Sequence, residues 1–550
     1  MSTDNRFNLG CWSQSLKRRA SVLARLQAPD APLVSIILAT YNTPVPVLQA
    51  LLDSILAQTY PRWELCVVDD ASKHTEAATL IERQARSNPR IRIHRRRDNG
   101  GISVATNDAV AQARGDYLAF VDHDDLLEPH ALERCVFQLL HDEADVVYTD
   151  QATIDLNDKI RSTFHKPDWS PEYFRHVMYV GHLLLVRRSL TLEVGGFDTH
   201  FDGVQDFEFM LRVSERTQRI AHVPEVLYYW RAIAGSLADA LDAKQGICEL
   251  QARAVQGHLQ RLQISAWATS HHSFPHRCRI QPRLRQHPRV SIIIPTKDQP
   301  QLIAQCLSSI YTKTRYPDLE VVLVDNDTTD PDALNAMAAH PARIVPFRQP
   351  FNFSAACNAG ARASSGEILV FLNNDTEVIA HDWLEHLVFH LAEPDVAVAG
   401  GLLLYPDGSV QHAGVVLGAR GTADHVMRGA KAEVDGYAGA LSSPREVSAV
   451  TGACLATTRA RFEQVGGFNT LYHTHYQDVD LCLKLTAQGQ RCIITPEAKL
   501  FHHESPSRGG RYDLLDRLLL IDTWGDKLRA DPYYPAQCCI QKLDYSPAAG

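Results

Sequence analysis

The segment GDYLAFVDHDD (residues 115–125) is an apolar run of strand length that ends in acidic side chains. Open α/β sheets bind ligands at the carboxyl ends of their strands. Aspartates at spacing i, i+2 suit a hard divalent cation that carries a diphosphate. We therefore expect Asp122 and Asp124 to bind such a cation; the alternative is that they only cap a helix. Asp125 is expected to cap the helix that follows.

The chain repeats this segment as GEILVFLNNDTE (residues 366–377), with Asn373 and Asp375 in the places of the two predicted metal ligands. Six further landmarks recur in the same order in both halves. They are VSIILAT and VSIIIPT, YPRWELCVVDDA and YPDLEVVLVDND, GISVATNDAVAQARGD and NFSAACNAGARASSGE, VGGFD and VGGFN, GVQDFEFMLRV and HYQDVDLCLKL, and PEVLYYWRAIAGS and PEAKLFHHESPS. Two copies of domain size indicate an internal duplication into tandem domains.

Strands alternate with helices along each copy, which predicts βαβ units and an α/β fold with a mainly parallel sheet. A chain of 550 residues suits two such domains. The predicted organisation is a lead-in (1–32), a first domain (33–237), a helical, Pro-rich linker (238–288), a second domain (289–508) and a C-terminal helical tail (509–550).

The composition is that of a soluble globular protein, with 45% hydrophobic and 22% charged residues. A net charge of -9 gives no support to nucleic-acid binding. The basic runs at 17–19, 95–97 and 283–289 are either solvated faces or contacts to anionic lipid headgroups. The sequence contains no GxxxxGK[ST], GxGxxG or GxSxG motif, which argues against an NTPase, a dinucleotide oxidoreductase and a serine hydrolase.

The sequence has no apolar run long enough to span a bilayer and no signal-peptide core at its start. Its 12 cysteines are scattered without CxxC pairs, which is typical of reduced thiols. We therefore expect a cytoplasmic protein, with at most peripheral contact at the inner face of the cell membrane.

Acidic or amide side chains end the second strand of each copy: Asp69 and Asp70 in the first, Asp325 and Asn326 in the second. They could accept hydrogen bonds from a base or a ribose hydroxyl, or they could simply form turns. Their repetition at one place in both halves favours the functional interpretation.

Asp206 and Asp478 lie in a repeated Q-D-x-[DE] motif that opens a helix. Either could be a general base that takes a proton from an attacking hydroxyl, and the alternative is charge compensation at the helix N-terminus. Glu208 and Asp480 follow two residues later and could orient the acceptor.

His502 and His503 follow the apolar residues AKLF. They could supply a third metal ligand or a phosphate contact, or they could be structural. Aligning the two copies places Trp230 opposite His502 and Arg231 opposite His503, so the first copy has no histidine there. Arg231 could still hold a phosphate.

The motifs VSIILATYN, VVDDAS, FVDHDD, VGGFD and QDFEF resemble those of the family 2 glycosyltransferases, inverting GT-A enzymes that use nucleotide-diphosphate sugars. The resemblance covers about residues 33–237 and 289–508. The segments FHHESPSRG and DPYY are similar to bacterial enzymes that build O-antigen and other surface polysaccharides, many of them rhamnosyltransferases.

The resemblance implies Mg²⁺ or Mn²⁺ at Asp122 and Asp124 and at Asp375 with His502, and bases at Asp206 and Asp478. It implies nucleotide contacts at Thr40, Asp69, Asp70, Thr296, Asp325 and Asn326. Three features depart from the family pattern: Lys297-Asp298 in place of Tyr41-Asn42, Asn373 in place of an aspartate, and glutamine at Gln205 and Gln477.

The leading hypothesis is a bifunctional glycosyltransferase whose halves each add one sugar to a bacterial surface glycan, with a glycan acceptor that could be lipid-linked. The second hypothesis is one catalytic half and one degenerate half that only grips the acceptor. A third, from another class, is a non-catalytic carbohydrate-binding scaffold.

Overall fold

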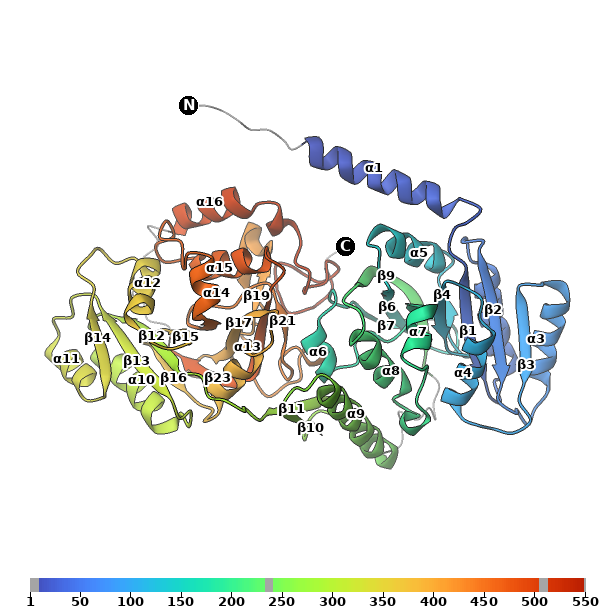
Figure 1. Ribbon diagram of the computed structural model, residues 1–550, viewed down its shortest axis with the longest axis horizontal. Helices are drawn as coiled ribbons and strands as arrows, with labels where there is room; N and C mark the ends of the chain where they lie inside the picture. Colours follow the sequence, from blue (N-terminus) through green and yellow to red (C-terminus); the bar gives the residue numbers. More distant parts are fainter. Residues whose placement is uncertain (1–8, 233–240, 504–512, 549–550) are drawn as a thin grey trace. The chain divides into compact units, whose positions relative to one another are not determined.

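A computed structural model of the chain describes residues 9–232, 241–503 and 513–548 (Figure 1). The chain forms two compact units, one made of Met1–Trp169 and Met178–Gln263, the other of Ser170–Val177 and Ile264–Gly550. Each contains one large sheet with helices, which confirms the predicted α/β fold with tandem domains. The predicted boundaries at 237/238 and 508/509 and the segment 504–512 lie outside the described residues.

The first unit has the strand order β3-β2-β1-β4-β8-β6-β9-β5, with β7 paired to β6. Its strands are β1 (Val34–Thr40), β2 (Trp63–Asp69), β3 (Ile91–Arg95), β4 (Tyr117–Val121), β5 (Leu126–Leu127), β6 (Val146–Ile154), β7 (Ile160–Phe164), β8 (Leu184–Arg187) and β9 (Ile220–Arg231). Its helices are α1 (Leu9–Leu26), α2 (Val45–Leu56), α3 (Glu76–Ser87), α4 (Ile102–Gln112), α5 (Ala131–His141), α7 (Arg188–Glu193), α8 (Gln205–Ser214) and α9 (Leu241–Arg261).

The second unit has the strand order β14-β13-β12-β15-β22-β17-β23-β16, with β18 paired to β17 and β21 paired to β23. Its strands are β12 (Val290–Thr296), β13 (Leu319–Asp325), β14 (Ala342–Pro346), β15 (Ile368–Leu372), β16 (Thr376–Val378), β17 (Val396–Leu404), β18 (Val410–His412), β21 (Arg445–Val447), β22 (Cys454–Thr458) and β23 (Arg491–His502). Two small ribbons pair β10 (Ala266–Ser270) with β11 (Cys278–Pro282) and β19 (Val415–Leu417) with β20 (Ala423–His425). Its helices are α6 (Pro171–His176), α10 (Pro300–Lys313), α11 (Pro331–Ala338), α12 (Phe353–Ala363), α13 (Trp383–Leu391), α14 (Arg459–Gln464), α15 (Gln477–Thr486) and α16 (Asp513–Trp524).

The two sheets have the same order when each strand is replaced by its repeat, so the duplication extends to the topology. The pairs β1–β2, β2–β3, β1–β4 and β6–β9 are parallel. The strand β8 runs antiparallel to β4 and β6, as β22 does to β15 and β17, which makes both sheets mixed. The parallel strands bring their carboxyl ends, and the polar residues that follow them, to one edge of each sheet.

Both faces of the second sheet are covered, which explains why most residues of its central strand, β12, are apolar. Ile292 and Ile294 pack with α10 and α13, whereas Ile293 packs in a second core with α12 and α15. Alternate residues of a strand point to opposite faces, so a doubly covered strand reads as a continuous apolar run. The helix α12 approaches closely at Gly360, where a Cβ atom would lie 2.4 Å from Ile293 Cγ2.

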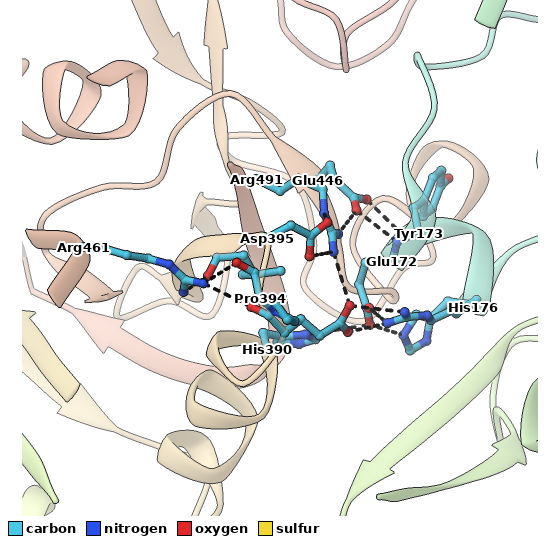
Figure 2. Close-up of polar contacts among 12 residues, drawn as sticks. Glu172, Tyr173, His176, His390, Pro394, Asp395, Glu446, Arg461 and Arg491 are labelled. Atoms are coloured by element: carbon cyan, nitrogen blue, oxygen red, sulfur yellow. Dashed lines mark hydrogen bonds and ion pairs between the residues drawn. The ribbon is translucent and has the colours of Figure 1, made fainter. Parts of the chain in front are cut away.

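The short helix α6 comes from the first half of the sequence but belongs to the second unit. The Glu446 carboxylate accepts hydrogen bonds from the first N–H groups of α6, at Glu172 (2.9 Å) and Tyr173 (3.3 Å). Glu446 also pairs with Arg491 at 2.5 Å (Figure 2). Within α6, Arg175 pairs with Glu172 at 2.7 Å, and these charged side chains are buried. Because buried charges are stable only when paired, this network fixes α6 in the second unit.

None of the helices within the described residues combines the length and the apolarity needed to cross a membrane.

Candidate active sites at the sheet edges

The Asp70 side chain holds the glycine turn that starts α4. Its two oxygens accept hydrogen bonds from the N–H groups of Gly100 and Gly101, at 2.9 Å each. Arg96 Nε lies 3.0 Å from the same carboxylate. These contacts satisfy the buried acid with donors from one loop, and the nucleotide contact of Asp70 stays a prediction.

Asn326 occupies the corresponding position in the second unit. It holds the equivalent loop as a hydrogen-bond donor, whereas Asp70 holds its loop as an acceptor. Its Nδ2 group donates to the backbone oxygens of Phe347 (2.8 Å) and Gln349 (2.9 Å). The change from aspartate to asparagine therefore follows the loop, which presents carbonyl groups here and N–H groups in the first unit.

The preceding aspartates and the threonines of the central strands lie side by side at the sheet edge. The registers pair Thr40 with Asp69 and Thr296 with Asp325. The Asp69 carboxylate accepts a hydrogen bond from Ser72 Oγ (2.5 Å), and Asp325 accepts one from the Thr328 N–H (3.0 Å). The structure thus brings these predicted nucleotide contacts to one place in each unit.

In the first unit, the acidic cluster lies beside a histidine that the sequence interpretation missed. His182 Nε2 is 3.2 Å from Asp122 Oδ2. Although burial opposes ionisation, the His182 imidazole lowers the pKa of Asp122, and Asp122 raises the pKa of His182 to about 9. Burial raises the pKa of Asp124, with a further contribution from the charge of Asp122.

Asp125 does not cap the helix α5, so that expectation is wrong. Its carboxylate is fully buried and accepts hydrogen bonds from Tyr228 Oη (2.6 Å) and the Arg231 N–H (2.8 Å). Burial, together with the charge of Asp122, raises its pKa to about 8. These hydrogen bonds link the end of β4 to β9. They can form because the chain continues from Asp125 directly into β5, which pairs with β9.

The Arg231 guanidinium is held by hydrogen bonds and an ion pair with residues of the first unit. It donates to the backbone oxygens of Asp124 (2.9 Å) and Asp155 (3.1 Å) and pairs with Asp158 at 2.6 Å. The side chain is buried. Its predicted phosphate contact stays a prediction. In the second unit, His503 Nε2 lies 3.4 Å from Glu377 Oε2, and its phosphate contact also stays a prediction.

The second unit brings Asn373, Asp375 and His502 together. His502 Nε2 is 3.1 Å from Asp375 Oδ1 and 3.2 Å from Asn373 Nδ2. The other ring nitrogen, Nδ1, is 2.5 Å from Gln411 Oε1. An amide oxygen can only accept, so Nδ1 carries the hydrogen and Nε2 is directed at the acid and amide.

These donors fit a hard divalent cation. Among the described residues, no group of three or more His, Cys, Asp and Glu side chains is arranged to hold a metal on its own. Mg²⁺ is usually bound by one or two carboxylates and completed by substrate phosphates and water. Asp122 with Asp124, and Asp375 with His502, are donor sets of that incomplete kind.

The proposed bases open the helices α8 and α15. Asp206 Oδ1 accepts the Phe207 N–H at 2.9 Å, and Asp478 Oδ1 accepts the Val479 N–H at 2.9 Å. Burial raises the pKa of Asp206, and the charges of His182 and Asp122 also act on it. The position of Asp206 in the first turn of α8 also agrees with charge compensation at the helix N-terminus.

Asp478 is linked to the end of β15 through two backbone residues. Its Oδ2 accepts the Gly452 N–H at 2.7 Å, and the next residue, Ala453, accepts the Asn373 N–H at 3.2 Å. The proposed base and the proposed metal ligands therefore lie on either side of one short segment.

The residues two positions after the bases are buried in ion pairs with their own helices. Glu208 pairs with Arg212 at 2.6 Å, and Asp480 pairs with Lys484 at 2.8 Å. Trp524 Nε1 also donates to Asp480 at 3.0 Å. Their predicted role toward an acceptor stays a prediction.

The helix α16 holds the loop that precedes the second base, which the sequence interpretation did not foresee. The buried Asp516 carboxylate accepts hydrogen bonds from three successive N–H groups, at His473 (3.1 Å), Thr474 (3.0 Å) and His475 (3.0 Å). No repeated motif includes Asp516, so the comparison of the two halves could not reveal it.

Residues 35–195 and 291–462 match the sequence model of the family described as "Glycosyl transferase family 2". The chain is 38% identical over 549 residues to "Uncharacterized protein y4gI" of Sinorhizobium fredii (strain NBRC 101917 / NGR234), which covers 97% of this chain and 60% of that protein. It is 39% identical over 533 residues to "O-antigen biosynthesis protein RfbC" of Myxococcus xanthus, which covers 93% of this chain and 41% of that protein.

A solved structure, Staphylococcus aureus TarS 1–349 in complex with UDP, aligns with 40% of this chain and 65% of its own length, at 21% identity and a TM-score of 0.34. The chain spans 60% and 41% of the lengths of the two relatives named above.

Proposed function

The chain belongs to glycosyl transferase family 2, and from this premise we propose that each unit transfers one sugar, which makes the chain a bifunctional enzyme. The observation that carries the proposal is the recurrence of one arrangement. In each unit a histidine lies about 3 Å from one acid of the strand-end pair, Asp122 at 3.2 Å in the first and Asp375, the counterpart of Asp124, at 3.1 Å in the second, and a carboxylate opens the neighbouring helix. A half retained only for grip would have no need of these groups.

The proposed donor is a nucleotide-diphosphate sugar. Asp69 and Asp70, and Asp325 and Asn326, are proposed to bind the nucleotide near the threonines that end the central strands. Asp122 with Asp124, and Asp375 with His502, would hold Mg²⁺ or Mn²⁺. When bound, such a cation stabilises the negative charge that develops on the departing diphosphate.

The proposed chemistry is a single in-line displacement. The acceptor hydroxyl oxygen forms a bond to the anomeric carbon as the bond from that carbon to the diphosphate oxygen breaks, and its electron pair leaves with the diphosphate. The hydroxyl proton passes to Asp206 or Asp478. Attack opposite the leaving group inverts the anomeric configuration.

We propose a bacterial surface glycan, such as O-antigen, as the product, because a relative aligned over 93% of the chain is described as an O-antigen biosynthesis protein. The test is a panel of nucleotide sugars, dTDP-rhamnose included, incubated with the full chain and Mn²⁺ while release of nucleoside diphosphate is measured. Turnover of one or two donors with transfer to a glycan acceptor supports the proposal. Binding of glycan without turnover of any donor would instead support a carbohydrate-binding scaffold.

The pH dependence of the first unit should reflect Asp206. A general base must be ionised to accept a proton, and the pKa of Asp206 is raised by burial. First-unit transfer should therefore fall as the pH drops through a value above about 4, the pKa of an ordinary aspartate. Initial rates in an Asp478→Asn background would measure it, with circular dichroism to verify folding. A rate that stays constant down to about pH 4 would contradict the assignment.

Asp516 should matter for the second unit alone. The change Asp516→Asn weakens the three hydrogen bonds that hold residues 473–475 before the base helix. A misplaced catalytic group can cost about 10²-fold, so we expect second-unit transfer to fall by roughly 10- to 100-fold. The matched control is Asp522→Asn, an exposed acid on the same helix. Equal rates for both variants would disprove the role.

A further inference from the structure

The two units differ at the position from which the second unit supplies its histidine. The β16–β23 register pairs Glu377 with Phe501, and the β5–β9 register pairs Leu126 with Tyr229. One residue further along, His502 in the second unit therefore corresponds to Trp230 in the first. Trp230 is 41% exposed and cannot supply a metal ligand. On this comparison alone, the first unit is the degenerate half.

The first unit has a histidine on the other side of the same strand end. His182 lies just before β8, and the registers pair Leu184 with Phe120 and Leu455 with Phe371. Counting back along both strands, His182 corresponds to Ala453 of the second unit. Each unit thus has histidine at one of the two positions and a residue that cannot coordinate at the other.

Both histidines direct Nε2 at a strand-end carboxylate, although the two acids are not at equivalent positions, because Asp122 corresponds to Asn373 and Asp375 corresponds to Asp124. His182 uses Nε2 to approach Asp122 Oδ2 at 3.2 Å, and His502 uses Nε2 to approach Asp375 Oδ1 at 3.1 Å. The His182 ring also stacks on Tyr228, with a centroid separation of 5.0 Å and an interplanar angle of 23°. Both rings therefore meet a strand-end carboxylate, His182 from the segment that precedes β8 and His502 from the end of β23, which pairs with β16.

A buried lysine fixes the segment that carries His182. Lys166 is 1% exposed, and its Nζ donates to the backbone oxygens of Val180 (2.6 Å) and His182 (2.9 Å). Two hydrogen bonds from one ammonium hold the backbone on both sides of residue 181. The orientation of His182 is thus built into the fold and does not depend on an exposed side chain.

We infer that His182 is the first unit's counterpart of His502: it coordinates the divalent cation of the donor diphosphate beside Asp122, so the first unit is a complete site and not a degenerate one. The inference rests on the proposed function and deepens it. It assigns the two units the same ligand chemistry delivered from different strands.

The test uses the full chain with Mn²⁺ and inorganic pyrophosphate, and reads coupling of Mn²⁺ to histidine nitrogen by electron spin-echo envelope modulation. His502→Ala should retain nitrogen coupling, and His182→Ala with His502→Ala should lose it and lower the remaining Mn²⁺ affinity at least tenfold. Adding Trp230→His to the double variant should restore the coupling, because it puts histidine at the second unit's position. The control is His200→Ala, which removes an exposed histidine that pairs with Asp198.

Loss of all nitrogen coupling in His502→Ala, with Mn²⁺ still bound at two sites, would overturn the inference. Failure of Trp230→His to restore coupling in a variant with native circular dichroism would also count against it. The signal is read without any sugar donor. If the protein shows the expected coupling but turns over no nucleotide sugar, the proposed function is wrong. His182 would still be a metal ligand.

Discussion

Asp478→Asn is expected to lower sugar transfer by the second unit by about 10²- to 10⁴-fold and to leave transfer by the first unit unchanged. Asparagine keeps the size of the side chain, but its one oxygen can keep only one of the two hydrogen bonds that the Asp478 carboxylate accepts, from the Gly452 N–H at Oδ2 and from the Val479 N–H at Oδ1. It cannot take the proton of an attacking hydroxyl. Asp206→Asn should show the reverse pattern, with a loss of the same size confined to the first unit.

Product analysis separates the two activities in the full chain. Each single variant should accumulate the product of the other unit, and the double variant should make neither. Asp202→Asn, at an exposed acid near the first base, is the matched control and should keep both activities. If both single variants kept full transfer, the base assignments would be wrong; if each lost both products, the units would not act independently.

Glu446→Ala should lower the free energy of unfolding of the second unit by about 3–5 kcal/mol, the range found when one partner of a buried ion pair is removed. The change leaves the buried Arg491 with one acid fewer and strips the first N–H groups of α6 of their acceptor. Denaturant titration followed by tryptophan fluorescence and circular dichroism would measure it.

The matched control is Glu433→Ala, which removes an exposed carboxylate of the same unit and should change stability by no more than about 0.5 kcal/mol. Glu446→Gln is a second probe, because it keeps a hydrogen-bond acceptor for α6 but removes the charge. A loss of under about 1 kcal/mol for Glu446→Ala would show that the network is not what holds α6.

The fold could be predicted because its signals are local and occur twice. VSIILAT and VSIIIPT are buried on both faces of a sheet, and a strand in that setting is predominantly apolar. The strand order was not predicted, although the structure shows that the repeat extends to it. The mixed direction of β8 and β22 did not follow, because periodicity within a strand says nothing about its direction.

The candidate sites could be predicted only where the two halves agree. His182 was missed because its counterpart is Ala453, and a search for shared residues discards such a position. Asp125 was misjudged because its partners, Tyr228 and the Arg231 N–H, are more than a hundred residues away in the sequence. The reason for an amide at Asn326 lies in its loop, which presents carbonyl groups to the side chain and which the sequence alone does not describe.

The helix α6 limits how the chain can be divided into fragments that correspond to its two units. If the gene were divided between residues 263 and 264, the N-terminal fragment would include Ser170–Val177, which belongs to the second unit. That fragment would carry Glu172 without His390 and Arg175 without Glu393, and the other would keep Glu446 without the N–H groups of α6 that it accepts. Exchange of the second unit between related chains must therefore move a discontinuous module, Ser170–Val177 together with Ile264–Gly550, and substitutions in the full chain are the better test of each unit's proposed role.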